Sequence, residues 1–337
     1  MGGNALKNIK TRRYSAIEYS KLAFQVSKTL NSLDIKNAIP LSYSSKETYG
    51  DLDVLIKSDS LGNRNIRDII IAKYNPHQIH HNEHIYSFDY KEFQIDFILV
   101  PDADWITSYY YYSYNDLGNL IGRISYQMGF RYGHYGLKLV YRHDDGGKKF
   151  EKIISKDIYK ILDFLGFDVE RYKQGFVKLE DVFDFVIDSK YYNPHVFDYE
   201  VLNHQNRTRN KKRVNYAKFL DYVKENNKKS NYIFGDKDMY VEMAEKYFGI
   251  DIVTQIKAWN KVVERDKEIS AKFNGDMIMQ KYPHLTGKEL GNAITNFKFV
   301  INSLYGVDSK KDDFYKDWIY NNDVETIFDE FKVINKL

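Results

Sequence analysis

Residues Pro40–Ile56, PLSYSSKETYGDLDVLI, join a polar, serine-rich turn to an apolar run that carries two aspartates. Asp51 and Asp53 are separated by one residue, and side chains two apart on a β-strand point to the same face of a sheet. The two carboxylates are therefore predicted to project together, while the apolar residues Leu52 and Val54 point to the other face. This pattern predicts a strand that is apolar on one side and acidic on the other.

A second apolar run, Phe93–Val100 (FQIDFILV), carries a third aspartate, Asp96. Together with the residues before it, this run is predicted to form a β-hairpin that turns at residues 89–91. We expect the strand of Asp96 to lie beside the first strand, so that three carboxylates meet on one face. Because like charges repel, such a cluster needs a cation, and oxygen ligands favour Mg²⁺ or Mn²⁺ over zinc. The sequence therefore predicts a divalent metal site at Asp51, Asp53 and Asp96.

Four histidines stand before this hairpin, at positions 77, 80, 81 and 84. Their spacing would suit a metal site on a helix. Pro76 and the β-prone residues after Ile85 argue against a helix, so we do not expect a histidine metal site here. His84 stands at the start of the hairpin that carries Asp96. A position of its side chain near the acidic cluster therefore stays an open alternative.

The composition is that of an ordinary globular protein, with 43% hydrophobic and 29% charged residues among 337. The absence of cysteine excludes disulfides, thiolate zinc sites and cysteine nucleophiles. No apolar run approaches the roughly 20 residues that span a bilayer, and the first residues lack the apolar segment of a signal peptide. We therefore expect a cytoplasmic protein with no membrane partner; the oligomeric state is not indicated.

The pattern of the chain changes near residue 150. Residues 14–33 are predicted to form a helix, because Ser15 and Glu18 have the spacing of a capping box, and residues 62–74 are predicted to form another. Residues 115–130 are predicted to form a helix capped by Asn115, with Asn119 and Arg123 on its polar side. A hairpin is expected to turn at Asp145-Gly146.

Beyond this hairpin nearly every segment has a helical pattern, including one long span from about Ile252 to Met279. We therefore predict an α+β fold. Residues 1–150 would form a domain with a mixed sheet and flanking helices, and residues 151–337 a mostly helical domain.

A basic run lies at the start of one of these predicted helices. Its members are Arg207, Arg209, Lys211, Lys212 and Arg213. A net charge of +3 does not by itself mark a nucleic-acid-binding protein, but clusters of this kind bind phosphate backbones. The alternative, a solvated helix start, stays open at this point.

The acidic strands and the turn before them resemble the polymerase-beta-type nucleotidyltransferase superfamily. In that superfamily a Gly-Ser element ends a helix, a strand with Asp-x-Asp follows, and a third carboxylate lies on a later strand. Leu41-Ser42 stands in the Gly-Ser place, Asp51-Leu52-Asp53 in the place of the paired acids, and Asp96 in that of the third. Leu41 departs from the glycine of the pattern, so the placement of a nucleotide would differ in detail.

Two further segments carry the resemblance. Residues His81–Pro101 are similar to the corresponding hairpin of archaeal-type CCA-adding enzymes. The whole chain resembles uncharacterised nucleotidyltransferase-like proteins of large phages and giant viruses, which begin with a similar Met-Gly-Gly segment and contain a similar NDLGNLIGR helix.

The resemblance implies a palm-like catalytic domain that transfers a nucleoside monophosphate from a nucleoside triphosphate, such as ATP, to a hydroxyl and releases pyrophosphate. It implies that Asp51 and Asp53 bind two Mg²⁺ or Mn²⁺ ions, that Asp96 binds one of them and helps to activate the hydroxyl, and that Ser42 contacts the β- or γ-phosphate. From their positions, further nucleotide contacts are predicted for Ser44, Lys46, Asn119 and Arg123.

Three functions stay open. The first is addition of nucleotides to an RNA 3′ end, with tRNA among the candidates, which the hairpin resemblance and the basic run favour. The second is nucleotidyl transfer to a protein or a small molecule. The third is a catalytically silent protein that binds a nucleotide.

Overall fold

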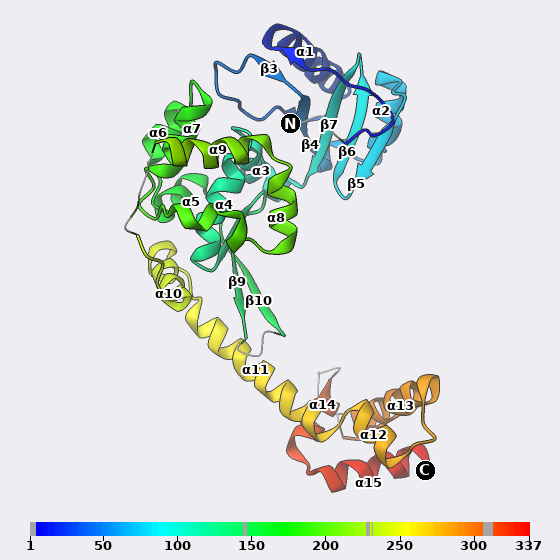
Figure 1. The fold of residues 1–337 in the computed structure, drawn as a ribbon. Helices are drawn as coiled ribbons and strands as arrows, with labels where there is room; N and C mark the ends of the chain where they lie inside the picture. The colour runs from blue at the N-terminus through cyan, green and yellow to red at the C-terminus, as the bar shows by residue number, and fades with distance from the viewer. Residues whose placement is uncertain (1–4, 144–146, 227–229, 231, 306–312) are drawn as a thin grey trace. The chain divides into compact units, whose positions relative to one another are not determined.

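The computed structural model describes residues 5–143, 147–226, 230, 232–305 and 313–337 (Figure 1). The chain forms two compact units. The N-terminal unit comprises Met1–Tyr141 and Lys149–Ile252, and the C-terminal unit comprises Arg142–Lys148 and Val253–Leu337. The assignment of a catalytic domain to residues 1–150 and of an acceptor domain to residues 151–337 stays a prediction.

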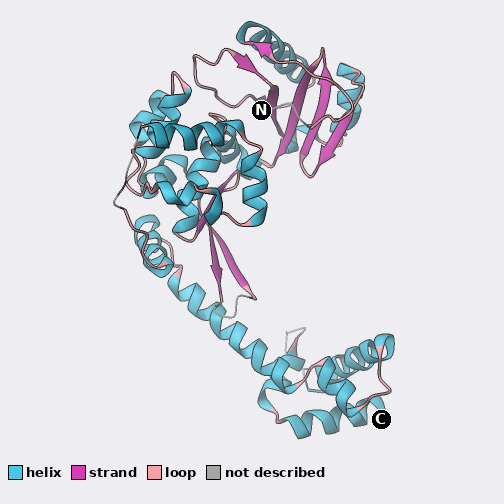
Figure 2. Ribbon diagram, viewed as in Figure 1, coloured by secondary structure: helices cyan, strands magenta, loops and turns pink. Residues whose placement is uncertain are grey.

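The fold is α+β, as predicted, with the strands in the first half of the chain and helices after them (Figure 2). The N-terminal unit contains β1 (Tyr14–Ser15), α1 (Ala16–Asn31), β2 (Asn37–Ala38), β3 (Thr48–Tyr49), β4 (Asp51–Lys57), α2 (Ile66–Tyr74), β5 (Ile79–Asn82), β6 (Ile85–Tyr90), β7 (Phe93–Val100), α3 (Trp105–Tyr112), α4 (Leu117–Gln127), β8 (Phe130–Gly133), β9 (Gly136–Arg142), β10 (Lys149–Ser155), α5 (Ile158–Phe164), α6 (Val169–Gln174), α7 (Leu179–Ile187), α8 (His204–Lys211), α9 (Val214–Glu225) and α10 (Lys237–Phe248). The C-terminal unit contains α11 (Val253–Lys272), α12 (Gly275–Lys281), α13 (Gly287–Tyr305), α14 (Phe314–Asn321) and α15 (Val324–Asn335).

The main sheet of the N-terminal unit has five strands in the order β2-β4-β7-β6-β5. Strands β4 and β7 run parallel, and the other neighbouring pairs are antiparallel, so the sheet is mixed as predicted. In the parallel pair, Asp53 lies opposite Asp96 and Asp51 lies opposite Gln94. This register places the acidic residues of two strands side by side.

One face of the sheet is covered by α1 and α2. Leu52 and Val54 of β4 are fully buried in a core that also contains Val26 of α1 and Ile70 of α2. Helix α1 begins with the predicted capping box, in which Ser15 and Glu18 satisfy each other's backbone N–H groups. The predicted alternation is therefore confirmed, because Leu52 and Val54, which alternate with the aspartates along β4, point into this core.

The opposite face is covered over only part of its length. Helix α3 packs on Leu55, Ile98 and Val100, which form a small separate core with Trp105 and other aromatic residues of the helix. Leu55 follows Asp53 on the same face of β4, and Ile98 follows Asp96 on β7. The sheet face thus changes from apolar beneath α3 to acidic at the aspartates.

Two expectations about secondary structure are wrong in detail. The helix predicted at residues 115–130 begins at Leu117, with Asp116 rather than Asn115 at the N-cap. The long helical span is two helices, because Asn274 caps a new helix, α12, directly after α11. Strands β9 and β10 pair as expected, while the predicted turn at Asp145-Gly146 lies outside the described residues.

The C-terminal unit is built from helices packed around aromatic residues. Phe297 of α13 and Phe331 of α15 are fully buried at its centre, with Ile278 of α12 and Ile319 of α14 beside them. Across the described ranges, no helix combines the length and the apolar character needed to cross a membrane.

Candidate metal centre

Asp51, Asp53 and Asp96 meet on the sheet face that α3 leaves uncovered. One carboxylate oxygen of each lies within 4.8 Å of those of the other two, and all three residues are half-buried. Within the described part of the chain, this is the group of three or more acidic, histidine or cysteine residues that can hold a metal ion. The convergence predicted from the sequence is confirmed.

The cluster is electrostatically unfavourable without a cation. Burial raises the pKa of Asp53 well above its ordinary value, and the nearby Asp51 and Asp96 raise it further. Burial also raises the pKa of Asp96 to about 7, with a further contribution from Asp51, although hydrogen bonds from Ser87 and Gln94 act in the opposite direction. The raised pKa values of Asp53 and Asp96 show that binding of a proton or a cation by these two carboxylates is favoured.

The donor set fits Mg²⁺ or Mn²⁺. Hard divalent cations of this size are bound by carboxylate oxygens and usually retain waters for the remaining positions. The half-buried position of the aspartates leaves the site accessible to such waters and to a substrate. A dication placed among Asp51, Asp53 and Asp96 would replace their mutual repulsion by attraction.

Gln94 orients the third aspartate, a role that the sequence reading did not identify. Its Nε2 donates to both carboxylate oxygens of Asp96, at 2.9 and 3.1 Å, and its side chain is almost completely buried. Its Oε1 accepts from the backbone N–H of Ala5 at 3.0 Å, which fixes the orientation of the amide. The signal available in the sequence was the position of Gln94, two residues before Asp96 on the same strand face.

Lys46 brings a positive charge to the acidic cluster. Its Nζ donates to Oδ1 of Asn115 at 2.8 Å and lies 4.3 Å from the centre of the Tyr49 ring. Burial lowers the pKa of Lys46, and the charges of Asp51 and Asp53 act against that shift. The structure therefore places this predicted phosphate contact beside the aspartates.

Hydrogen bonds of its backbone groups hold the turn before β4 in place. The N–H of Leu41 donates to Ser113 Oγ at 3.0 Å, and its carbonyl accepts from the N–H of Tyr114 at 2.6 Å. The N–H of Ser44 donates to the carbonyl of Phe176 at 3.0 Å. These three backbone groups of Leu41 and Ser44 are therefore hydrogen-bonded to other parts of the protein. In this respect the turn differs from a glycine turn that presents its backbone to a triphosphate.

The Ser42 hydroxyl lies against the Tyr49 phenol and hydrogen-bonds it. Tyr49 in turn stacks on Tyr19, with ring centres 3.7 Å apart. Burial, followed by the charge of Asp53, raises the pKa of Tyr19, so this aromatic pair borders the acidic cluster. Tyr49 therefore contacts both Ser42 and Lys46, so these two side chains lie on the same side of the acidic cluster.

The loop between α3 and α4 has an unusual backbone. Tyr114 and Asn115 are both left-handed, with φ of 57° and 59°, a conformation that costs free energy in residues other than glycine. Asn115 does not cap α4; it accepts the hydrogen bond from Lys46 instead. Its neighbour Asp116 forms an ion pair with Arg213. Through these two contacts, the loop links Lys46, which lies beside the aspartates, with Arg213 of the basic run.

Asn119 and Arg123 have contacts within the protein. Arg123 was expected on the polar side of its helix, which is wrong: it is 5% exposed, and its guanidinium donates to the carbonyl of Val196 at 2.9 and 3.1 Å. Asn119 donates to Asn210 at 3.2 Å and accepts from Arg209 at 2.9 Å. Both side chains join α4 to the helices and turns that follow residue 190, and their predicted nucleotide contacts stay predictions.

The basic run divides into two groups. Arg207 donates to the carbonyls of Glu200 and Leu202, and Arg213 pairs with Asp116, so both are half-buried and tied to the fold. The other three members are exposed, and they are Arg209, Lys211 and Lys212. These exposed side chains are the part of the run that a phosphate backbone can reach.

His84 lies near the acidic cluster through Tyr112. Its Nε2 is 3.4 Å from the Tyr112 hydroxyl. Burial, then Tyr111 and Asp53, raise the pKa of Tyr112, which shows that this phenol is close to the aspartates. His80 and His81 lie on strand β5, in agreement with the prediction that this segment is not helical.

No protein-family model matches the chain, and no curated protein matches it significantly. The structural findings that bear on the resemblance are the mixed N-terminal sheet and the cluster of three aspartates on β4 and β7.

Proposed function

We propose that the protein is a metal-dependent nucleotidyltransferase, which transfers a nucleoside monophosphate from a nucleoside triphosphate to an acceptor hydroxyl. The observation that carries the proposal is the convergence of Asp51, Asp53 and Asp96 within 4.8 Å on neighbouring parallel strands. The raised pKa values of Asp53 and Asp96 support it, since they mark carboxylates that need a cation.

Each residue has a separate task in this proposal. Asp51 and Asp53 would hold the divalent ions, which lower the pKa of the attacking hydroxyl and neutralise the triphosphate when bound. Asp96, held by Gln94, would accept the hydroxyl proton. The hydroxyl oxygen then forms a bond to the α-phosphorus, and the bond between the α-phosphorus and the bridging oxygen to the β-phosphate breaks. Pyrophosphate carries away the bonding electrons.

Lys46 would contact the phosphates of the nucleotide. Its charge interacts with those of both Asp51 and Asp53, and its hydrogen bond to Asn115 limits its orientations. The Ser42 hydroxyl, which hydrogen-bonds Tyr49 on the same side of the site as Lys46, would provide a second contact to the phosphates.

The acceptor in this proposal is the 3′ hydroxyl of an RNA. The exposed side chains of Arg209, Lys211 and Lys212 support this choice, because such groups bind phosphates without sequence preference. Transfer to a protein or a small molecule would not require this exposed basic group.

The proposal is tested by incubating the full-length protein with each α-³²P-labelled nucleoside triphosphate, Mg²⁺ and total RNA. We expect labelled RNA and equimolar pyrophosphate, and no product when EDTA replaces Mg²⁺. If a protein or a small molecule were labelled instead of the RNA, that molecule would be identified as the acceptor. The absence of any product with Mg²⁺ or Mn²⁺ would refute the transferase activity.

Lys46→Gln is expected to raise the KM for the nucleotide about tenfold, because one hydrogen bond from a charged group contributes about 1.5 kcal/mol. The affinity for the RNA acceptor should stay unchanged. Lys73→Gln, on the exposed face of α2, is the matched control. An unchanged KM in the Lys46 variant would exclude the phosphate contact.

Lys211→Gln with Lys212→Gln is expected to weaken RNA binding and to lower the slope of log K against log salt by about 1.4, since each phosphate contact to a single strand contributes about 0.7. Lys21→Gln with Lys28→Gln, exposed on α1, makes the same charge change elsewhere. Equal salt slopes in the two double variants would remove α8 from the RNA site.

A further inference from the structure

A short segment before β1, residues 5–8, contacts the sheet next to the metal centre. We call it the strap. The backbone N–H of Ala5 donates to Oε1 of Gln94 on β7 at 3.0 Å, and the backbone N–H of Asn8 donates to Oε1 of Gln78 at 3.2 Å. Gln78 directly precedes the edge strand β5. Two backbone N–H groups therefore attach the strap to side-chain amides.

The strap contacts the face of the sheet that carries the three aspartates. Gln94 lies opposite Asp51 on β4 and opposite Asp89 on β6. It also precedes Asp96 by two residues on β7. Residues in these positions share one face of a sheet. The strap therefore reaches a residue in the row next to that of Asp53 and Asp96.

The N–H of Ala5 determines which way the amide of Gln94 points. A backbone N–H only donates hydrogen bonds, so the atom of Gln94 that faces Ala5 has to be the oxygen. The nitrogen Nε2 is then directed to Asp96, where it donates to both carboxylate oxygens. If the amide were turned over, its oxygen would face an ionised carboxylate, which only accepts hydrogen bonds. The strap thereby stabilises the orientation that holds Asp96.

The strap is held less firmly than the strand beneath it. Of residues 5–8, all of which the structure describes, Leu6 alone is buried, while Lys7 and Asn8 are exposed. Segments with few buried apolar side chains open at a smaller cost in free energy than the core of a sheet. Gln94, in contrast, stands between Phe93 and Ile95, which are both fully buried. The strap can therefore detach while Gln94 stays in the sheet.

We propose that the strap positions the metal ligand Asp96 through Gln94 and thereby controls the metal centre. When the strap is docked, Nε2 of Gln94 holds the carboxylate of Asp96 in one orientation. When the strap is released, the amide is free to turn, and Asp96 is no longer held ready for the metal. The effect on nucleotide transfer rests on the proposed function, whereas the effect on metal affinity does not.

The test removes the two hydrogen-bonding groups one at a time in the whole chain. Ala5→Pro removes the N–H of the strap, because proline has no backbone N–H. Gln94→Met replaces the amide by a thioether of similar length. Mn²⁺ affinity is measured by electron paramagnetic resonance without nucleotide, and kcat and KM are measured by transfer of α-³²P label at saturating Mg²⁺.

We expect Gln94→Met to weaken Mn²⁺ binding and to lower kcat, each by about tenfold to a hundredfold, the range for groups that orient metal ligands. Ala5→Pro should weaken Mn²⁺ binding about fivefold, the factor that one ordinary hydrogen bond contributes. In the double variant, Ala5→Pro should cause no further loss, because the strap acts through Gln94. The KM for the nucleotide should stay the same, since Asp96 is not among its proposed contacts.

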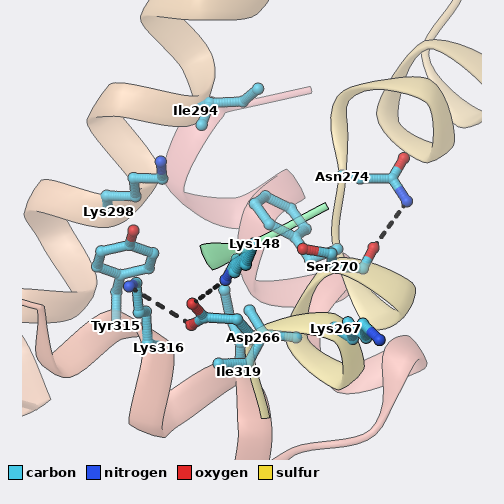
Figure 3. A pocket seen from close by; sticks show the side chains of 12 residues that line it. Lys148, Asp266, Lys267, Ser270, Asn274, Ile294, Lys298, Tyr315, Lys316 and Ile319 are labelled. Carbon is cyan, nitrogen blue, oxygen red and sulfur yellow. Dashed lines mark hydrogen bonds and ion pairs between the residues drawn. The ribbon is translucent and has the colours of Figure 1, made fainter. Parts of the chain in front are cut away.

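Asn274→Leu is the control for a general loss of stability. Asn274 lines a hollow of about 490 Å³ in the C-terminal unit, and its Nδ2 donates to the carbonyl of Ser270 at 2.8 Å (Figure 3). Its Oδ1 accepts from the N–H of Met277 at 2.9 Å. Like Gln94, this amide therefore bridges two groups. Its loss should lower the Tm and leave Mn²⁺ affinity and kcat unchanged. Lys10→Pro, at an exposed position beyond the strap, controls for the proline.

Full Mn²⁺ affinity in Ala5→Pro would overturn the proposal, as would equal losses from Ala5→Pro with and without Gln94→Met. A loss in Asn274→Leu or Lys10→Pro as large as that in the matching strap variant would overturn it too. If the unmodified protein bound no Mn²⁺, the proposal would fall together with the metal centre. If the Mn²⁺ affinities followed the expected pattern while the unmodified protein transferred no nucleotide, the role of the strap would be supported and only the transferase activity refuted.

Discussion

Asp53→Asn is expected to lower the rate of Mg²⁺-dependent nucleotide transfer by about a thousandfold or more. Asp53 lies opposite Asp96 in the parallel pair of strands and next but one to Asp51, so it is the central carboxylate of the cluster. An amide has almost the same shape but no charge, and the loss of several kcal/mol of metal-dependent stabilisation corresponds to a rate factor of this size. Asp51→Asn and Asp96→Asn should have effects of the same order.

The measurement is the rate of α-³²P transfer at saturating nucleotide and Mg²⁺. Asp68→Asn, an exposed acid on α2, controls for the change of charge. Circular dichroism should show an intact fold in all the variants, because the replaced side chains lie on the face that α1 and α2 do not cover. Activity close to that of the unmodified protein in the Asp53 variant would contradict the mechanism.

The metal-free protein is expected to lose stability as the pH rises from about 4 to about 7. The pKa of Asp96 is raised to about 7 in the folded protein from its ordinary value of 3.8. In this range the folded state keeps a proton that the unfolded state has released, so a rise in pH favours unfolding. Allowing for solvent screening of a half-buried group, the loss is of the order of 2 kcal/mol.

Thermal unfolding with EDTA at pH 5 and pH 8 measures this effect. For a unit of this size, about 2 kcal/mol corresponds to roughly 4–8 °C in Tm. At pH 8, Asp53→Asn should raise the Tm of the metal-free protein, because it removes a repelling charge, and Mg²⁺ should raise the Tm of the unmodified protein only. A Tm in EDTA that increases from pH 5 to pH 8, or a Mg²⁺ effect that survives in the variant, would contradict the electrostatics of the cluster.

The features predictable from the sequence are those that depend on residues close together in the chain. The alternation of Asp51 and Asp53 with apolar residues predicts which face of β4 is buried, and the Ser15–Glu18 spacing predicts the start of α1. The proximity of Asp96 could be predicted because its apolar strand has to pair within a small sheet. Local pattern and a single long-range pairing were sufficient to predict the cluster of three aspartates.

The surroundings of the metal centre depend on contacts between distant residues. Arg123 looks polar by type, yet it is buried because the carbonyl of Val196 accepts its hydrogen bonds. Asn115 looks like a helix cap, yet its left-handed backbone turns its side chain to Lys46. Neither partner can be identified from residue type or spacing, since both lie more than sixty residues away in the chain.

Binding of Mn²⁺, followed by electron paramagnetic resonance in the presence of a non-hydrolysable nucleoside triphosphate, tests the metal centre most directly. We predict that the unmodified protein and Asp68→Asn bind Mn²⁺ at the nucleotide site, and that Mg²⁺ competes for it. Asp53→Asn should lose this binding while retaining its fold. Equal Mn²⁺ binding by the unmodified protein and Asp53→Asn would contradict the assignment of Asp51, Asp53 and Asp96 as metal ligands.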